Sequence, residues 1–410
     1  MTGPSPRQWA AAPVASAATS FDRMWSALEP IGRDRRTGGY RRFAWTREDA
    51  TLREWFAGEA AARRLTLSVD RAGNQWAWHG DPDELPGVVV GSHLDSVPDG
   101  GAFDGPLGVV SAFAALDDLR ERGFTPNRPV GVVNFCDEEG ARFGVACAGS
   151  RLLTGALSGD RARGLTDTDG VTMAEAFRQA GHDPAWLGAD NATLRRVAAF
   201  VELHVEQGYH LARVRRSIGV ASAIRPHGRW RIELPGEANH AGTTAIADRQ
   251  DAMLAAAQIV LAARAAAERH DALTTCGKLH VAPNGINAIP SHVAVWLDVR
   301  APTATQVRAA VTDVGAVALA LGGTLEEESW SDTTTFPEAP GIAELLEDAP
   351  VLDTGAGHDA GILAGAGVPA AMLFVRNPTG VSHAPAEFAE HADCIAGVDS
   401  LARVIEELAR

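Results

Sequence analysis

The sequence predicts an α/β fold in which a larger domain with a mainly parallel sheet carries a smaller, inserted α+β domain. Short apolar runs alternate with helical patterns in the first half of the chain, which is typical of a buried parallel sheet. From about residue 214 the strands instead alternate in polarity and accompany two long Ala-rich helices. At 410 residues the chain is also too long for one ordinary core.

The elements of the larger domain follow from hydrophobic spacing. Residues 47–65 place apolar side chains three and four positions apart, which predicts a helix. Residues 107–123 do the same, and Gly123 marks the end of that helix. Continuous apolar runs bounded by turn residues predict four buried strands, at residues 87–93, 129–140, 198–208 and 369–375.

The inserted domain is expected to span residues 214–329, which leaves residues 1–213 and 330–410 for the larger domain. Two alternating segments predict half-exposed strands, and two Ala-rich segments predict helices. The strands are expected at residues 228–237 and 292–300, and the helices at residues 251–270 and 303–321.

Composition excludes several classes of partner. The formal net charge of −15 argues against binding to nucleic acid or to an anionic membrane, because both need basic surfaces. The four cysteines are scattered without a CxxC pair, which favours a reducing compartment over a disulfide scaffold. The N-terminus lacks the basic start and apolar stretch of a signal peptide, and no apolar run is long enough to cross a bilayer. We therefore expect a cytoplasmic protein with a small-molecule partner.

Metal-ligand side chains follow the predicted strands of the larger domain. His93 follows the apolar run "GVVV", Glu138 and Glu139 follow "VVNF", and His204 follows "AAFVEL". Open α/β sheets bind ligands beyond the carboxyl ends of their strands, so these residues can converge. His383, in "GVSHAPAE", follows the late apolar run and can join them.

These motifs are weak singly and stronger together. A lone "HLD" at His93 is typical of a hydrogen-bonded structural histidine, and a lone "DEE" is typical of a solvated acidic turn. Their shared position at strand ends, with Asp104 in a Gly-rich loop, favours a metal site instead, since imidazole and carboxylate are ligands of zinc and similar ions. The neighbours Glu138 and Glu139 can divide the work, one binding metal and the other taking a proton from water.

Six segments, in order along the chain, resemble the successive signatures of the M20 metallohydrolases. The resemblance runs from about residue 20 to residue 408. It is closest to the branch that holds N-carbamoyl-L-amino acid hydrolases, allantoate amidohydrolases and ureidopropionases. The segments are "GSHLDSVPDGGAFDGPLG", "DEEGARFG", "ELHVEQG", "NHAGTT", "GAGHDA" and "GVSHAPAEF".

The resemblance implies two divalent metal ions per subunit, zinc or manganese before cobalt or nickel. Asp104 would bridge the ions, and the other four ligands would be His93 and His204 on one ion and Glu139 and His383 on the other. It further implies that Asp95 orients the imidazole of His93 through a hydrogen bond and that Glu138 is the general base.

The resemblance also implies substrate residues and a homodimer formed through the inserted domain. His240 would reach the partner subunit's active site and stabilise the oxyanion. Asn287 and Arg300 would hold the substrate carboxylate, although an ordinary surface ion pair is the alternative for Arg300. Gln207 and His358 are expected to line the site.

The expected activity is cleavage of the ureido C–N bond of a small N-carbamoyl acid, with allantoate ahead of an N-carbamoyl-L-amino acid. An aminoacylase or dipeptidase is less expected, because many of those carry a carboxylate in place of His204. A protein that only binds a ligand would have no need of Glu138 beside Glu139. The family usually continues "NHAGTT" with Pro-Met, whereas this chain has Ala-Ile, and the loop "VRNPTGVSH" also departs from the family pattern. These two departures leave the substrate open.

Overall fold

The computed structural model describes residues 16–410 and divides into two compact units. One unit comprises Met1–Ala223 and Thr335–Arg410, and the other comprises Ile224–Thr334. The N-terminal stretch that we searched for a signal peptide lies mostly outside the described residues. The second unit differs in its bounds from the expected insert, 214–329, because β6 (Ile218–Ile224), which the apolar pattern did not reveal, pairs with strands of the larger unit.

The larger unit is built on a nine-stranded sheet whose four central strands run parallel. Every residue of β3, β4 and β15 is buried, as their continuous apolar runs predict. In sheet order the central strands are β4 (Val130–Phe135), β3 (Gly87–His93), β5 (Val197–Val205) and β15 (Ala370–Val375). The prediction of a mainly parallel central sheet is confirmed.

The remaining strands extend this sheet on both sides. β2 and β6 run antiparallel to the central strand beside them. They are short or only partly apolar, and the sequence pattern did not single them out. The outer strands are β1 (Thr66–Val69) and β2 (Gln75–His79) on one side, and β6, β13 (Thr334–Thr335) and β14 (Val351–Thr354) on the other.

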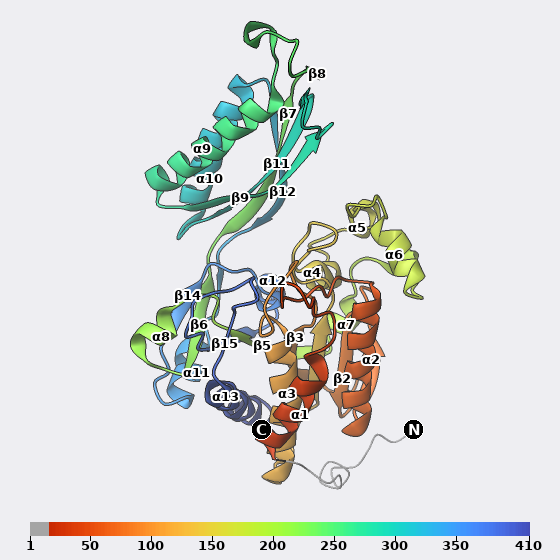
Figure 1. Ribbon diagram of the computed structural model, residues 1–410. Coiled ribbons are helices and arrows are strands. Elements are labelled where there is room, and N and C mark those ends of the chain that lie inside the picture. Colours follow the sequence, from red (N-terminus) through yellow and green to blue (C-terminus); the bar gives the residue numbers. More distant parts are fainter. Residues whose placement is uncertain (1–15) are drawn as a thin grey trace. The chain divides into compact units, whose positions relative to one another are not determined.

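Helices cover the sheet of the larger unit. α3 (Pro106–Glu121) packs on β3 and β5, and α13 (His391–Leu408) packs on α3 and β15. α1 (Ala17–Leu28) contacts both helices, and the three lie side by side (Figure 1). α2 (Arg47–Ala62), one of the predicted helices, packs against β1 and β2, and α12 (Asp359–Gly365) packs against β5 and β15. The other helices of this unit are α4 (Ala148–Thr154), α5 (Gly159–Gly164), α6 (Met173–Gln179), α7 (Asn191–Leu194), α8 (His210–Val214) and α11 (Ala339–Leu345).

The smaller unit is a four-stranded antiparallel sheet with two helices on one face. Figure 1 shows α9 and α10 side by side against this sheet. Along β7 buried and half-buried residues alternate, and Trp230, Ile232 and Leu234 face the helices as part of the core. Burial of each such side chain contributes about 1.5–3 kcal/mol. The sheet order is β12 (Thr324–Ser331), β7 (His227–Pro235), β11 (His292–Arg300) and β9 (Leu273–Ala282), and the helices are α9 (Ala252–His270) and α10 (Ala304–Ala320).

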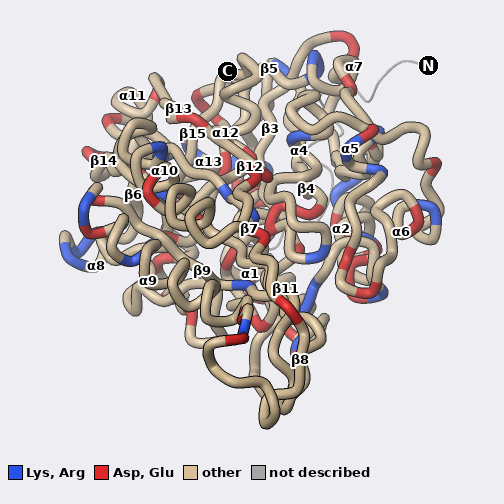
Figure 2. Tube along the Cα trace, turned by 90° about the horizontal axis from the view of Figure 1, so that it is seen from above, with Lys and Arg blue, Asp and Glu red and all other residues tan. Residues whose placement is uncertain are grey.

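Acidic and basic residues are interspersed along the described trace (Figure 2). Between residues 16 and 410, no helix combines the length and the apolar content that crossing a lipid bilayer requires. A short ribbon, β8 (Asn239–His240) paired with β10 (Ala288–Ile289), completes the smaller unit.

Candidate metal centre

The parallel strands of the larger unit deliver the candidate ligands to one edge of the sheet. His93 is the last residue of β3, and His204 is the penultimate residue of β5. Glu139 follows β4, Asp104 lies just before α3, and His383 lies in the loop after β15. Five residues that are far apart in sequence therefore approach one another at the carboxyl ends of the strands.

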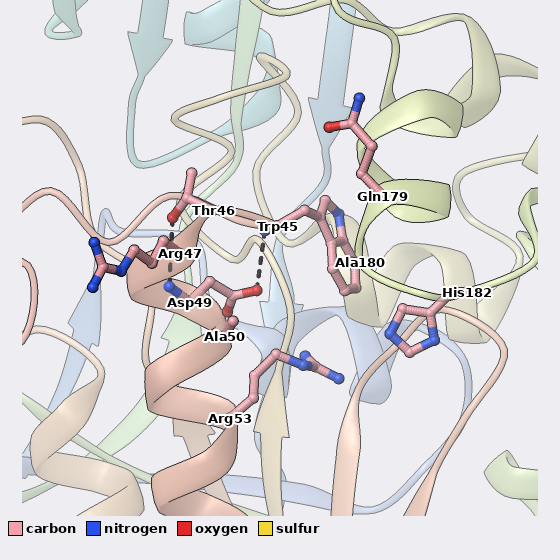
Figure 3. Close-up of a pocket in the computed structure, with 9 residues that line it drawn as sticks. All are labelled: Trp45, Thr46, Arg47, Asp49, Ala50, Arg53, Gln179, Ala180 and His182. Carbon is pink, nitrogen blue, oxygen red and sulfur yellow. Dashed lines mark hydrogen bonds between the residues drawn. The ribbon is translucent and has the colours of Figure 1, made fainter.

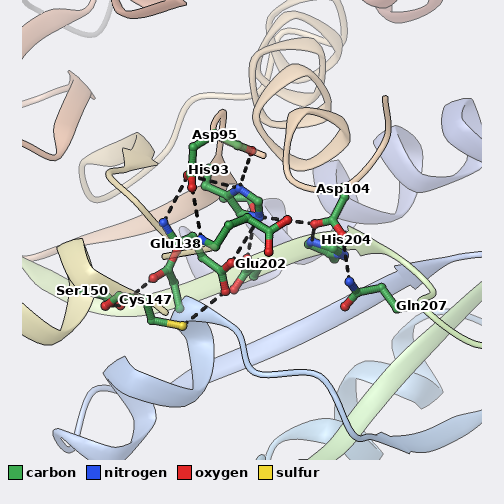
Figure 4. Close-up of polar contacts among 12 residues, drawn as sticks. His93, Asp95, Asp104, Glu138, Cys147, Ser150, Glu202, His204 and Gln207 are labelled. Carbon is green, nitrogen blue, oxygen red and sulfur yellow. Dashed lines mark hydrogen bonds and ion pairs between the residues drawn. The ribbon is translucent and has the colours of Figure 1, made fainter. Parts of the chain in front are cut away.

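The five side chains form two groups that share one carboxylate. Asp104 Oδ1 lies 3.1 Å from His204 Nε2 and 3.5 Å from His93 Nε2. Asp104 Oδ2 lies 3.3 Å from His383 Nε2, and Glu139 Oε2 lies 3.7 Å from the same nitrogen. Within each group the possible ligand atoms all lie within 4.8 Å of one another. Figure 4 shows Asp104 directed at the two buried imidazoles. The grouping matches the two ligand sets that the resemblance implies.

Several donor atoms of these groups fit a divalent cation. His93 Nε2, His204 Nε2 and Glu139 Oε1 are buried, and within residues 16–410 none of them makes a hydrogen bond, although both nitrogens lie close to Asp104. Buried polar atoms almost always have a partner, so three such atoms around one carboxylate call for an ion or water. The donor set of imidazole nitrogen and carboxylate oxygen suits zinc, manganese, cobalt and nickel.

The acidic and basic groups of the cluster shift one another's pKa. Burial and the neighbouring Asp104 raise the pKa of Glu139 to about 7, although His383 and His93 oppose the shift. Desolvation lowers the pKa of His383, but Asp104 and Glu139 outweigh it and bring the pKa to about 9. Burial also acts to raise the pKa of Asp104, but His204 and the other two histidines hold it well below its usual range. Near neutral pH the cluster therefore retains protons that a bound cation would displace.

Asp95 links the imidazole to the acidic pair. Its backbone carbonyl oxygen lies 3.2 Å from His93 Nδ1, and its carboxylate lies 3.4 Å from the same nitrogen. The carboxylate oxygens also accept the backbone N–H groups of Glu138 and Glu139, each at 3.1 Å. Asp95 thus contacts the ring and in addition fixes the backbone of both glutamates, a second role that the sequence did not indicate.

Glu138 lies beside the cluster in an environment that favours its protonated form. Its Oε2 is 3.7 Å from His93 Nε2. Burial raises the pKa of Glu138 well above its usual range, and Asp359 and Glu139 add to the shift while His93 opposes it. A carboxyl group that holds a proton readily suits general acid–base chemistry.

A glycine makes the approach of Asp104 to His93 possible. Gly105 has a φ of +83°, and a Cβ at this position would lie 2.4 Å from Cε1 of the His93 ring. Neither the left-handed backbone nor the contact admits a side chain. Pro106 follows as the first residue of α3, where its fixed φ suits a helix start. The Gly-rich loop therefore places Asp104 beside the imidazole of His93, and α3 begins two residues later.

Glu387 ties together two ligand-bearing loops, which the sequence did not predict. Its Oε1 accepts the backbone N–H groups of Phe103 and Asp104 at 3.0 and 2.9 Å, and its Oε2 accepts the Ser382 hydroxyl at 2.9 Å. The segment "GVSHAPAEF" contains Glu387, but only the fold brings it to Asp104. It therefore holds the loops of Asp104 and His383 against each other.

Glu202 has a similar linking role beneath the histidines. It accepts the hydroxyl of Ser92 at 2.7 Å and the backbone N–H of Ala360 at 2.9 Å. It thus connects β3, β5 and the start of α12. A signal was present in the sequence, because Glu202 and His204 are two residues apart and so share one face of β5.

Gln207 and His358 both lie at the cluster. Gln207 Nε2 donates to Asp104 Oδ2 at 2.8 Å and lies 3.1 Å from His383 Nε2. The buried ring of His358, at the start of α12, lies edge-on to that of His204 with 4.5 Å between centroids. The structure therefore places Gln207 against the bridging carboxylate and His358 behind an imidazole.

The smaller unit separates the three substrate residues predicted there. His240 pairs with Ala288 across β8 and β10, and the adjacent Asn287 accepts the N–H of Ala241 at 3.0 Å. Arg300 instead lies at the far end of β11, whose nine residues span roughly 27 Å. His240 and Asn287 are thus brought together, whereas Arg300 lies at the other end of β11 from Asn287.

Arg300 engages its own strand neighbour, Asp298. Its Nε lies 2.7 Å from Asp298 Oδ1, and its Nη2 lies 3.1 Å from Asp298 Oδ2. This ion pair is the alternative that the sequence left open for Arg300. A substrate carboxylate would have to share the guanidinium with it.

A cavity of about 360 Å³ lies beside the start of α2, and none of its lining residues belongs to the cluster (Figure 3). Asp49 accepts the N–H of Trp45 at 3.0 Å, and burial raises its pKa to about 6. Arg53 donates to the carbonyl of Gly73 at 2.7 Å and stacks over the Trp45 ring. Asp49 and one nitrogen of Arg53 thus pair with protein groups, whereas Arg53 Nη1 is buried and has no hydrogen-bond partner within residues 16–410. We assign no ligand to the cavity.

A mainly parallel sheet with clustered imidazole and carboxylate donors at its carboxyl edge is typical of metal-dependent hydrolases. The family model "Peptidase family M20/M25/M40" matches residues 89–407, and the chain belongs to this family of hydrolases. Family membership and the candidate metal cluster agree, because M20 enzymes depend on metal ions.

Curated relatives and solved structures resemble the chain over almost its whole length. It is 35% identical to the N-carbamoyl-L-amino acid amidohydrolase of Geobacillus stearothermophilus over 417 residues, which cover 95% of this chain and 98% of that protein. It is 33% identical to the allantoate amidohydrolase of Escherichia coli (strain K12) over 391 residues, covering 91% and 93%. A hydantoinase/carbamoylase family amidase from Burkholderia vietnamiensis has a TM-score of 0.88 at 29% identity, covering 97% and 98%.

Proposed function

We propose that this protein is an amidohydrolase that cleaves the ureido C–N bond of a small N-carbamoyl acid with two bound divalent ions. The observation that carries the proposal is the pair of ligand groups that share Asp104, with Glu138 beside them. His93 and His204 would complete one ion, and Glu139 and His383 the other. Zinc or manganese is the first expectation, and cobalt or nickel fits the same donors.

Each residue then has a defined task in the reaction. Bound divalent ions would polarise the ureido carbonyl and lower the pKa of water. Glu138 takes a proton from the attacking water and passes it to the leaving nitrogen. His240 donates a hydrogen bond to the carbonyl oxygen as it becomes negative. The products are ammonia, carbon dioxide and the amine left after loss of the carbamoyl group.

The same proposal includes a homodimer formed through the smaller unit. Leu254 and Leu261 are 63% and 70% exposed on α9, and Leu273 is 69% exposed on β9. The outer edge of β9 has no partner strand within residues 224–334. Exposed apolar side chains beside an open strand edge favour association with a second copy. Since Asn287 and Arg300 are separated within one chain, we propose that they bind one substrate from different subunits.

Allantoate is the first candidate substrate. An N-carbamoyl-L-amino acid is the second, favoured by the 35% identity to a protein of that name. The test is ammonia release by the metal-loaded protein, given allantoate and a panel of N-carbamoyl-L-amino acids side by side. Turnover of allantoate alone supports the first candidate, and turnover of the carbamoyl amino acids supports the second. No ammonia from either, with two metals bound, contradicts the proposal and directs the assay to N-acyl amino acids and dipeptides.

A further inference from the structure

The thiol of Cys147 contacts the side chain assigned as the general base. Cys147 Sγ lies 3.2 Å from Glu138 Oε1, and both residues are buried. Figure 4 shows the sulfur of Cys147 directed at this carboxylate oxygen. Burial raises the pKa of the Cys147 thiol well above its usual range, so the sulfur carries a proton that it can donate.

Local backbone pairing holds Cys147 at this position. The N–H of Cys147 donates to the carbonyl oxygen of Glu138. The next two N–H groups, of Ala148 and Gly149, donate to the carbonyl oxygens of Asp137 and Cys136 at 3.0 and 2.9 Å. Three consecutive backbone hydrogen bonds therefore fix the segment of the thiol against the segment of the base.

The loop between Glu138 and Cys147 is closed so tightly that the distance between these two residues is fixed. Gly140 has a φ of +62°, and a Cβ there would lie 2.3 Å from the carbonyl carbon of Val145. Cys147 itself adopts a left-handed conformation with a φ of 52° and precedes α4. The contact between thiol and carboxylate is thus set by the fold of the loop between them.

The two oxygens of Glu138 have different neighbours. Oε1 contacts the thiol, whereas Oε2 lies toward the candidate metal cluster, 3.7 Å from His93 Nε2. Asp95 fixes the backbone N–H of Glu138 at 3.1 Å. The base is thereby held at its backbone and at one oxygen, which leaves the other oxygen to exchange protons.

We propose that Cys147 is a positioning residue, whose thiol donates a hydrogen bond to Glu138 Oε1 and keeps Oε2 directed at the metal cluster. The proposal rests on the proposed function, which makes Glu138 the base. The alternative is that Cys147 packs only as a small apolar side chain. Displacement of a general base lowers kcat without weakening substrate binding, and this effect separates the two explanations.

Infrared spectroscopy tests the contact without any substrate. The S–H stretching band of Cys147 is obtained as the difference between wild type and Cys147→Ser. The same difference is then measured in a Glu138→Gln background. The protein is metal-loaded, because bound cations favour the ionised form of Glu138. An amide is a weaker acceptor than a carboxylate, so the band is expected at higher frequency in that background. The band of Cys394, a buried thiol of α13, isolated with Cys394→Ala, serves as the control and is not expected to move. An unmoved Cys147 band overturns the proposal.

Kinetics then test the positioning role. Cys147→Ala is expected to lower kcat by about 5- to 10-fold, the effect of one hydrogen bond, with KM and metal content unchanged. Cys147→Ser, which retains a donor, is expected to recover part of that loss, and Cys394→Ala is expected to retain the wild-type kcat. Wild-type kcat in Cys147→Ala, or equal kcat in the Ala and Ser variants, overturns the proposal. If the wild type hydrolyses no ureido acid, the proposed function fails, while the infrared result still decides the contact.

Discussion

The larger and the smaller unit hold their candidate site residues in opposite ways. Asp104 and His204 are 6% and 1% exposed, and each contacts other polar groups of the cluster. His240 and Asn287 are exposed on a ribbon of two-residue strands. Charged groups that stay buried need fixed partners, whereas exposed groups gain electrostatic strength only when another surface excludes water. The geometry of the metal cluster is therefore fixed within one chain, whereas the function of the exposed ribbon depends on the surface that packs against it.

The largest expected effect lies in the larger unit, at Glu138. Glu138→Gln removes the group that accepts a proton but keeps the size of the side chain, so kcat is expected to fall by about 10²- to 10⁴-fold. Steady-state ammonia release, with metal content measured on the same samples, checks this. Both metals are expected to remain, because Glu138 belongs to neither ligand group. Turnover at the wild-type rate would remove Glu138 from the mechanism.

The next effect tests the smaller unit. His240→Ala removes the donor assigned to the carbonyl oxygen, and kcat is expected to fall by about 10²- to 10³-fold. Because the side chain is exposed and outside the cluster, thermal stability and metal content are expected to match the wild type. Glu326→Ala, exposed on β12 at the opposite edge of the sheet from β9, is the control and is expected to retain activity. An unchanged kcat in His240→Ala would limit the chemistry to the larger unit.

Mixing the two inactive variants sharpens the comparison further. If His240 serves the partner subunit, a hybrid dimer of Glu138→Gln and His240→Ala subunits contains one site with both side chains intact. Random re-association makes half of the dimers hybrid, so about a quarter of the wild-type activity is expected to return. Ammonia release before and after the subunits are exchanged measures the recovery. No recovery, with exchange verified by mass spectrometry of differently tagged subunits, would place both residues in one chain or exclude the dimer.

The difference between the units also explains what the sequence could predict. The strand that carries His93 was visible because all seven of its residues are buried in a parallel sheet, and such strands are continuously apolar. The candidate ligands were visible because parallel strands bring their carboxyl ends together. β6 was not visible, since only part of it is buried and it runs antiparallel at the side of the sheet.

Contacts made by tertiary approach were invisible in the sequence. Glu387 reaches the N–H of Asp104 across 283 positions, and no local pattern encodes that distance. Cys147 was counted only as one of four scattered cysteines, because its contact depends on a loop closing on itself. The separation of Asn287 from Arg300 follows from the length of β11 and from the pairing of two short strands. Residue types and their order thus indicated the chemistry, and the fold supplied the partners.

Glu387 offers a test of the organisation of the cluster. Glu387→Ala removes the acceptor that joins the loops of Asp104 and His383, so the affinity for metal is expected to fall by about 10- to 100-fold. Competition with a chromogenic chelator measures this change. Glu407→Ala, near the exposed end of α13, is the control and is expected to bind metal like the wild type. Unchanged affinity in Glu387→Ala would show that the two loops hold their positions independently.

The smallest expected effect is a dependence of stability on pH, to which the larger unit contributes most between pH 5 and pH 9. The pKa of Glu139 rises from 4.5 to about 7 on folding, so the native state binds more protons than the unfolded chain between these values. The pKa of His383 rises from 6.5 to about 9, so the stability it contributes below pH 6.5 is lost as pH rises through 9. Both shifts act in the same direction. The Tm of the metal-free protein is therefore expected to fall from pH 5 to pH 9, at about 2 °C per kcal/mol for a chain of this length.

Saturating metal opposes this fall, because the ions displace the same protons and bind more tightly as pH rises. Calorimetry of the metal-free and metal-loaded protein at each pH measures the difference. His383→Gln is expected to make the fall between pH 6.5 and 9 shallower, because it removes the contribution of this histidine and leaves those of Glu139 and of the buried histidines of the cluster. A metal-free Tm that stays level or rises over this range would mean that the imidazole and carboxylate donors do not share protons in the folded state. The contrast between a buried, mutually paired cluster in the larger unit and exposed site residues in the smaller unit would then not hold.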